Sequence, residues 1–271
     1  MWKLSKGLRM ALAMAALGHV SSAGAYMIND TYWGGNTHGW GDRIGGPVFE
    51  VQGANVLRQG STLLVDIFTS FAGHADEKQF ASLTNKAPSK LNGKSMGIGY
   101  GDLFLGTAWT PFGSDPHHPL DKADNGTHWS YGFALGADRW TDNGGTGFLY
   151  ALNGATNAAN AFLSDDMLSG GTFRNGQEIV VKTASRTVTK LASDSGTWLV
   201  DQTPNLRHLH FAINVAGTDL ATSPEIALHW AMSCGNDTIE GIHDVPEPGS
   251  MALALAALAT SWRMRRIATI C

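Results

Sequence analysis

Hydrophobic and polar residues alternate over short stretches of this chain. In residues 61–71 (STLLVDIFTSF) the side chains of Leu63, Val65, Ile67 and Phe71 fall on one side of an extended strand. A period of two is typical of a strand that buries only one face. The same reasoning predicts further strands at residues 48–57, 102–109, 129–135, 146–152, 178–191, 196–200, 207–215 and 226–233, of which 178–191 is either one long strand or one arm of a bent hairpin.

Clusters of turn-forming residues separate these strands. They are Asn92-Gly93, residues 113–116, Asp124-Asn125-Gly126 and residues 142–145 (DNGG). About nine short strands at this spacing, with no strong helical period, predict an all-β fold, a single-domain two-sheet β-sandwich or jelly roll. Residues 155–168 fit either one short helix or an irregular loop. The predicted domain spans residues 26–244.

The first 25 residues have the order of an export signal. Lys3, Lys6 and Arg9 precede an apolar run at residues 10–20, and the small-x-small site Ala23-Gly24-Ala25 follows. Positive, apolar and small segments in this order are what the secretory machinery recognises. Residues 1–25 are therefore predicted to be a signal peptide, which signal peptidase cleaves between Ala25 and Tyr26.

The C-terminal segment, residues 245–271, has three parts of its own. A Pro-containing turn is followed by an apolar run at 251–262 and then by a basic cluster. The turn consists of Val245, Pro246, Glu247, Pro248, Gly249 and Ser250, and the cluster contains Arg263, Arg265 and Arg266. This twelve-residue, almost wholly apolar run would make a helix about 18 Å long, against a hydrocarbon core about 30 Å thick, so we expect transient insertion. Arginines on the cytoplasmic side would leave the domain outside the membrane.

This order of Pro-Glu-Pro, apolar segment and arginines resembles the PEP-CTERM signal of Gram-negative surface proteins. The apolar run is shorter than is usual in that family, and Ile267 to Cys271 extend beyond the basic cluster. The resemblance implies sorting by the membrane enzyme exosortase to the cell surface or extracellular matrix. It also implies a structural or adhesive role in a biofilm, in association with exopolysaccharide. Residues 32–35 (YWGG), 101–105 and 229–237 resemble a class of exosortase-dependent surface proteins without an established activity.

Composition narrows the possible partners of the predicted domain. Between the two signals there are 13 Lys and Arg against 22 Asp and Glu, a net charge of −9, whereas the whole chain carries −4. Nucleic-acid binding requires basic residues that neutralise phosphates, so this charge argues against it. Cations and neutral glycans remain compatible. Cys234 is the only cysteine between the signals, so no disulfide within the domain is expected, and we interpret Cys234 as a small buried hydrophobic residue.

A glycine-rich segment near the start of the domain is the candidate glycan-binding site. Aromatic rings can stack on a sugar face while amide and imidazole groups bond its hydroxyls. The alternative is a loop whose tryptophans close one end of the sandwich. The candidate residues are Tyr32, Trp33, Asn36, His38 and Trp40.

Two groups of residues are candidate metal ligands. Asp42, Asn236, Asp237 and Glu240 could offer oxygen atoms to Ca²⁺, although Asn236-Asp237 also fits a simple turn. His208 and His210 share one face of a predicted strand, and His117-His118 or His229 could complete a metal site with them. Since no spacing in the sequence specifies a third ligand, chance placement of this pair is the simpler interpretation.

The competing function is that of a secreted polysaccharide hydrolase. Glycoside hydrolysis needs two carboxyl groups facing each other across a cleft. Asp66, Asp102, Glu178 and Glu225 are available, but the sequence does not pair them. The string Gly93-Lys94-Ser95-Met96-Gly97 matches G-x-S-x-G. A nucleophile elbow needs a strand before it and a helix after it, whereas here a turn precedes the string and a strand follows.

Overall fold

A computed structural model describes residues 27–30, 47–77, 90–91, 94–95, 98–110, 127–153, 178–181, 183–184, 186–233 and 237–245 of the chain. For residues 90–91, 94–95, 137 and 192–195 it describes the backbone alone. Short 3₁₀ helices occur at η2 (Pro47–Phe49), η4 (Gly136–Trp140) and η5 (Asp219–Ala221). A small separate hairpin pairs β4 (Lys90–Leu91) with β5 (Lys94–Ser95).

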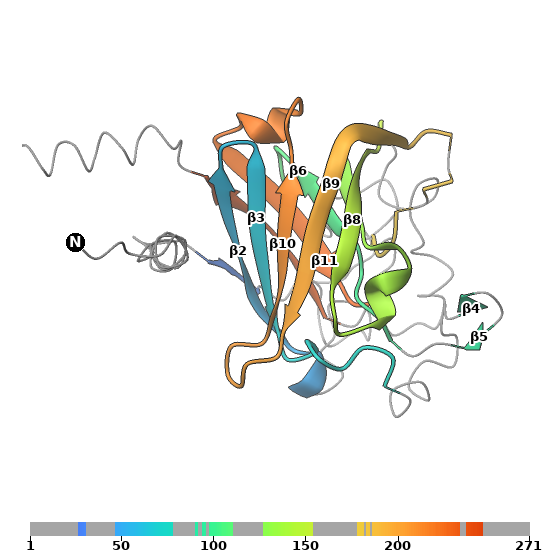
Figure 1. Ribbon diagram of the computed structural model, residues 1–271. Coiled ribbons are helices and arrows are strands. Elements are labelled where there is room, and N and C mark those ends of the chain that lie inside the picture. The colour runs from blue at the N-terminus through green and yellow to red at the C-terminus, as the bar shows by residue number, and fades with distance from the viewer. Residues whose placement is uncertain are drawn as a thin grey trace, which may run out of the picture.

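The other described strands form one antiparallel sheet (Figure 1). Its order is β1-β2-β3-β10-β9-β8-β7-β6-β11-β12. The strands are β1 (Ile28–Asn29), β2 (Val51–Gln59), β3 (Thr62–Thr69), β10 (His208–Asn214), β9 (Thr189–Asp201), β8 (Gly145–Ala151), β7 (Tyr131–Ala134), β6 (Leu103–Gly106), β11 (Glu225–Ala231) and β12 (Thr238–Asp244). β12 contacts both β1 and β2, so the sheet curls until its two edges meet. Figure 1 shows β2, β3, β10, β9 and β8 side by side in front of β6.

Two hydrophobic cores stabilise this sheet. Alternate residues of neighbouring strands, such as Val65 of β3 and the opposed Phe211 of β10, point into the main core between the layers. On β11, Ile226, Leu228 and Trp230 enter the main core, while Ala227 belongs to a second core. Successive side chains of a strand point to opposite faces, so the second core covers the other face of β6 and β11. Its other buried members are Phe104, Trp129, Ala134, Leu152, Val181 and Val188.

The all-β fold predicted from alternation is confirmed. The strands predicted at 61–71, 129–135, 146–152 and 207–215 correspond closely to β3, β7, β8 and β10. Those at 48–57 and 226–233 are shifted by a few residues, and 196–200 is the last part of the longer β9. In place of the separate sheets of a jelly roll, the described strands form one continuous curled sheet.

Three details of the strand prediction are wrong. Among the described residues of the 178–191 segment, only those from Thr189 onward form a strand, while Val181 and Val188 pack into the second core from outside it. The strand predicted at 102–109 is shorter, ending at Gly106. β12 was missed because Glu240, Gly241 and His243 interrupt any apolar period along it.

The turn predicted at residues 142–145 is present between η4 and β8. Gly144 adopts a φ of 71° there, a left-handed conformation that glycine tolerates without steric cost. The other three turn clusters, the helix or loop at 155–168, and Cys234 and Cys271 lie outside the described residues.

Both predicted sorting segments lie outside the described residues, except for Val245, which is buried. This includes the cleavage site at Ala23, Ala25 and Tyr26. It also includes Pro246, Glu247, Pro248, Gly249, Ser250 and the arginine cluster. Among the residues that are described, no helix is long and apolar enough to cross a membrane.

Candidate functional site

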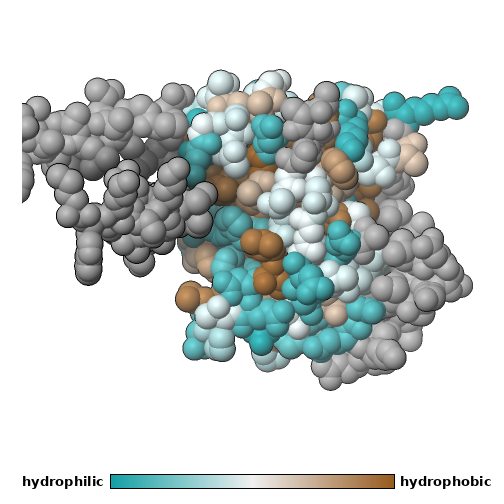
Figure 2. All heavy atoms as spheres, viewed as in Figure 1, coloured by the Kyte–Doolittle hydropathy of each residue, from teal (hydrophilic) through white to brown (hydrophobic). Residues whose placement is uncertain are grey.

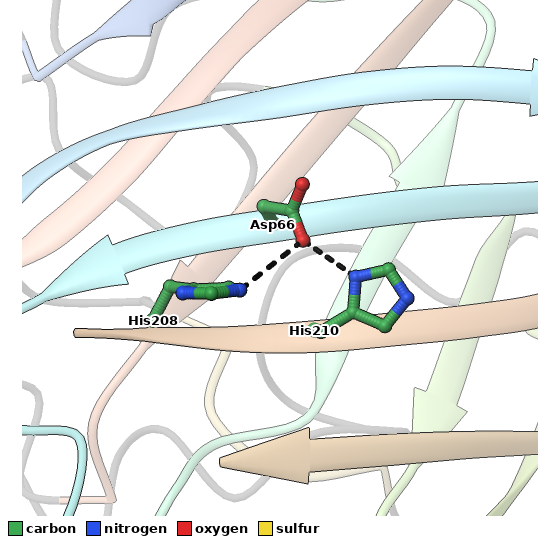
Figure 3. A group of neighbouring side chains, drawn as sticks. All are labelled: Asp66, His208 and His210. Carbon is green, nitrogen blue, oxygen red and sulfur yellow. Dashed lines mark hydrogen bonds and ion pairs between the residues drawn. The ribbon is translucent and has the colours of Figure 1, made fainter. Parts of the chain in front are cut away.

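Asp66, His208 and His210 meet on the outer face of the front layer of the sheet (Figure 3). Asp66 of β3 lies directly opposite His210 of β10, and His208 lies opposite Phe68. Residues two apart on a strand share a face, so β3 presents Asp66 and Phe68 on the same side as the two histidines. The three side chains are partly buried. We call them the Asp-His-His cluster.

Hydrogen bonds orient the side chains of this cluster. His210 Nδ1 lies 2.6 Å from Asp66 Oδ1 and donates to it. This bond raises the pKa of His210 above its usual value, against the opposing effect of partial burial. His208 Nδ1 lies 2.8 Å from the carbonyl oxygen of Leu206, and since a carbonyl only accepts, Nδ1 carries the proton. His208 Nε2 faces Asp66 Oδ1, 3.8 Å away.

An open groove of about 970 Å³ adjoins the cluster. Asn55, which faces Asp66 across the β2–β3 pair, and Phe68, whose ring lies 5.5 Å from that of His208, both line it. The apolar lining consists of Met27, Pro47, Val48, Phe68 and Leu206, and the polar lining consists of Gln52, Asn55, Ser70, His74, Asn205 and Arg207. Figure 2 shows the front layer from outside, with a small brown apolar area among hydrophilic and neutral residues.

The polar side of the groove is held in place by a chain of hydrogen bonds. Arg207 Nη1 donates to the carbonyl of Ala72 at 2.7 Å and to His74 Nε2 at 3.0 Å. Because an arginine only donates, His74 accepts through Nε2 and donates through Nδ1 to Glu77 Oε1 at 2.8 Å. Gln52 Nε2 donates to Ser70 Oγ at 2.8 Å. The groove thus has positioned donors and acceptors beside an aromatic ring.

A second ionisable group is enclosed in the second core. His229 Nε2 lies 2.6 Å from the backbone carbonyl of Glu178, and Nδ1 lies 2.9 Å from Glu240 Oε1. The carboxyl groups of Glu178 and Glu240 lie near the ring, and all three side chains are buried. Phe104 and Trp129 pack against the imidazole. This contact pairs two polar side chains, His229 of β11 and Glu240 of β12, inside an apolar core, so we assign the cluster a structural role.

Asp30, which is partly buried, and Asp237, which is fully buried, form an acidic pair close to the seam between β1, β2 and β12. Burial first, and then the neighbouring Asp30, raise the pKa of Asp237 to about 8. Burial, and then Glu50, raise the pKa of Asp30 to about 6. The interaction between the two side chains lowers the pKa of Asp30 and raises that of Asp237, so the proton resides on Asp237, whose Oδ2 accepts from the backbone N–H of Val51. The pair shares a proton and does not line the groove.

The structure separates the two described members of the predicted Ca²⁺ site. Asp237 stands directly before β12, and its Oδ2 accepts from the backbone N–H of Val51, which is distant in the chain. Glu240 bonds His229 in the second core. Asp42 and Asn236 lie outside the described residues, as do Tyr32, Trp33, Asn36, His38 and Trp40 of the predicted glycan site.

The four carboxylates considered for a hydrolase occupy different surroundings. Asp66 belongs to the Asp-His-His cluster, and Asp102 is fully buried against Arg139. Glu178 lies in the second core, whereas Glu225 is exposed at the start of β11. Ser95 of the G-x-S-x-G string lies on the short strand β5, consistent with our rejection of a nucleophile elbow.

Sequence reasoning identified the shared face of His208 and His210 but not their third partner. The alternation in residues 61–71 placed Asp66 on the polar side of its strand, which was a usable signal. The register that sets Asp66 opposite His210 joins strands more than 140 residues apart in the chain, and it depends on long-range pairing. Arg207 and His74 were missed for the same reason.

No known protein family, curated protein or solved structure matches this chain.

Proposed function

We propose that this chain is an exported protein of the cell surface or extracellular matrix, whose all-β domain binds a neutral polysaccharide. The observation that carries the proposal is the open groove beside β2, β3 and β10. Its volume is in the range of small-ligand sites, which span about 300–1,000 Å³. Amide, hydroxyl and imidazole groups border Phe68, a combination that suits the hydroxyls and apolar faces of sugars.

The sequence positions of two lining residues support the same proposal. The glycan-binding segment proposed from sequence lies between Met27 and Pro47, and both of these residues line the groove. A net charge of −9 between the two terminal signals favours neutral over anionic polymers, because like charges repel.

Binding accounts for the described groove better than hydrolysis does. None of its described lining residues carries a carboxylate. A glycosidase needs two carboxyl groups about 5–10 Å apart at one cleft. Two acidic pairs among the described residues, Asp30 with Asp237 and Glu178 with Glu240, do not line the groove, and the second of them is buried. We therefore favour a structural or adhesive role in exopolysaccharide over the competing hydrolase.

Replacing Phe68 by Ala should weaken polysaccharide binding by at least about tenfold, because buried aromatic contacts dominate many binding sites. Phe68 is only half-buried on the outer face, so the fold should survive. Binding of the full chain can be measured on a glycan array and then by calorimetry, with and without Ca²⁺. Gln52→Ala should weaken binding to a smaller degree.

Phe148→Ala provides a matched control for this test. Phe148 is a partly exposed aromatic residue on β8 of the same sheet but does not line the groove. Its removal should leave binding unchanged. If the wild-type chain binds no glycan in either condition, or if both phenylalanine variants lose binding equally, the groove is not a polysaccharide site.

The proposed export route involves signal peptidase, exosortase and transient membrane insertion of the C-terminal segment. Changing Arg263, Arg265 and Arg266 together to Asn should impair C-terminal processing in the native host, because the positive charges that hold the segment in place are lost. Mass spectrometry of surface and secreted fractions would measure this. A triple Lys variant keeps the charge and should be processed normally, whereas unchanged processing of the Asn variant would contradict the sorting role.

A further inference from the structure

The geometry points to a site for a divalent transition metal, best matched by Zn²⁺, at the Asp-His-His cluster of Asp66, His208 and His210. This inference is independent of polysaccharide binding. It concerns side chains that the proposed export route and the groove do not use.

The first argument is the rigidity of the ligand set. Asp66 and the two histidines stand on two directly paired strands inside a continuous sheet. The register places Asp66 opposite His210, with His208 two residues further along the same face. Their ligand atoms all lie within 4.8 Å of one another. Sites built on strands hold their ligands more precisely than sites built on loops.

The second argument is the orientation of His208. Its Nδ1 donates to the carbonyl of Leu206, and its Nε2 faces the carboxylate oxygen of Asp66 at 3.8 Å, too far for a direct hydrogen bond. Imidazole nitrogen and carboxylate oxygen are both common metal ligands, and a cation placed between these two atoms would bind both. Metal-bound histidines usually donate their other ring N–H to a carbonyl or carboxylate, as His208 does here.

The third argument is distance. In a tetrahedral site with metal bonds near 2.1 Å, neighbouring ligand atoms lie about 3.3–3.5 Å apart. The separations from Asp66 Oδ1 are 3.8 Å to His208 Nε2 and 2.6 Å to His210 Nδ1, which bracket that value. His210 would have to withdraw by less than about 1 Å and exchange its Nδ1 proton for the metal. Its side chain is about one-third exposed, which leaves room for this movement.

The ligand types select the metal. Two imidazoles and one carboxylate suit Zn²⁺, Ni²⁺ or Cu²⁺, whereas Ca²⁺ requires six to eight oxygen ligands. Three protein ligands leave at least one coordination position for water or another molecule. This open position lies at the edge of the groove, because Asn55, opposite Asp66, and Phe68, opposite His208, both line the groove.

Calorimetric titration of the chelator-treated full chain with Zn²⁺ tests the site. We expect one Zn²⁺ per chain, and His208→Ala and His210→Ala should each weaken binding by at least about tenfold through loss of one ligand. His128→Ala is the matched control because His128 is exposed and stands outside the cluster. Ca²⁺ should not compete with Zn²⁺ at equal concentration.

Co²⁺ gives a second readout that does not depend on affinity alone. The wild-type chain should develop the strong visible absorption of low-symmetry four- or five-coordinate cobalt, and His208→Ala should lose it while keeping its circular dichroism spectrum. The inference is overturned if the His208→Ala/His210→Ala double variant, folded by circular dichroism, binds Zn²⁺ as tightly as the wild type. It is also overturned if His128→Ala causes an equal loss.

Discussion

Asp102→Ala should destabilise the protein by about 3–5 kcal/mol, the usual effect of removing one partner of a buried ion pair. Asp102 has no exposed surface, and its Oδ1 accepts from Arg139 Nη2 at 2.7 Å and from the backbone N–H of Leu135 at 2.9 Å. Its Oδ2 accepts from the backbone N–H of Val181 at 2.7 Å. The substitution would leave a buried guanidinium and two buried N–H groups without these partners.

The remaining bonds of Arg139 explain why this contact organises the fold. The guanidinium also donates to the carbonyls of Tyr100 and Gly136, so the ion pair ties β6 to η4. The bond to Val181 attaches the irregular 178–188 segment that covers the second core. Loss of Asp102 should therefore weaken the attachment of η4 and of the segment around Val181 to the start of β6.

Urea unfolding followed by tryptophan fluorescence would measure this effect. Glu225→Ala, at an exposed carboxylate on β11, should change stability by less than about 0.5 kcal/mol. The double variant Asp102→Leu/Arg139→Met should be less destabilised than the sum of its single variants, since it removes both buried charges together. A loss below about 1 kcal/mol in Asp102→Ala would show that the pair has little structural importance.

The wild-type protein should become less stable as pH rises toward 8, and Asp237→Asn should remove this loss of stability. The pKa of Asp237 is raised to about 8 in the folded protein, above its ordinary 3.8. Between these values the folded state holds a proton that the unfolded state has released. Stability therefore falls with rising pH through this window, by at most about 1.4 kcal/mol per pH unit.

Asparagine reproduces the contacts of the protonated aspartic acid. Its amide can donate to Asp30 while its oxygen accepts from Val51, and it tolerates the φ of 53° at this position. We expect similar stability of variant and wild type near pH 4. At pH 7.5 the variant should be more stable by roughly 2 kcal/mol, allowing for the sharing of the proton with Asp30.

Chemical denaturation across pH 4–8 would test this prediction. Asp244→Asn, at the exposed end of the same strand, is the control and should follow the wild-type curve. Parallel curves for Asp237→Asn and the wild type would contradict a shared buried proton.

The strand pattern shows how far local sequence predicts the fold. β3 and β10 were predictable because one face of each is buried and the other is polar, which produces a clear period of two. β11 is buried on both faces, and its apolar run was still recognisable. β12 was not, because its Glu240 becomes acceptable in a core only through contact with His229.

The same limit applies to the site. Residues 61–71 and 207–215 each showed a polar face, but the meeting of Asp66 with His210 depends on β3 and β10 being neighbours in one register. A one-residue slip would turn every one of these side chains to the other face. The predicted glycan and sorting residues are local patterns outside the described residues, and they stay predictions.

Alternation along the chain is thus enough to specify β structure and its buried faces, because each strand's period depends only on its own residues. Strand order, register and the curling of the sheet depend on contacts between distant segments, and these contacts decide which polar side chains meet. These contacts place Asp102 beside Arg139, Glu240 beside His229, and Asp66 beside His208 and His210. No local pattern contains that information, since the free energy of each contact exists only once the whole sheet has formed.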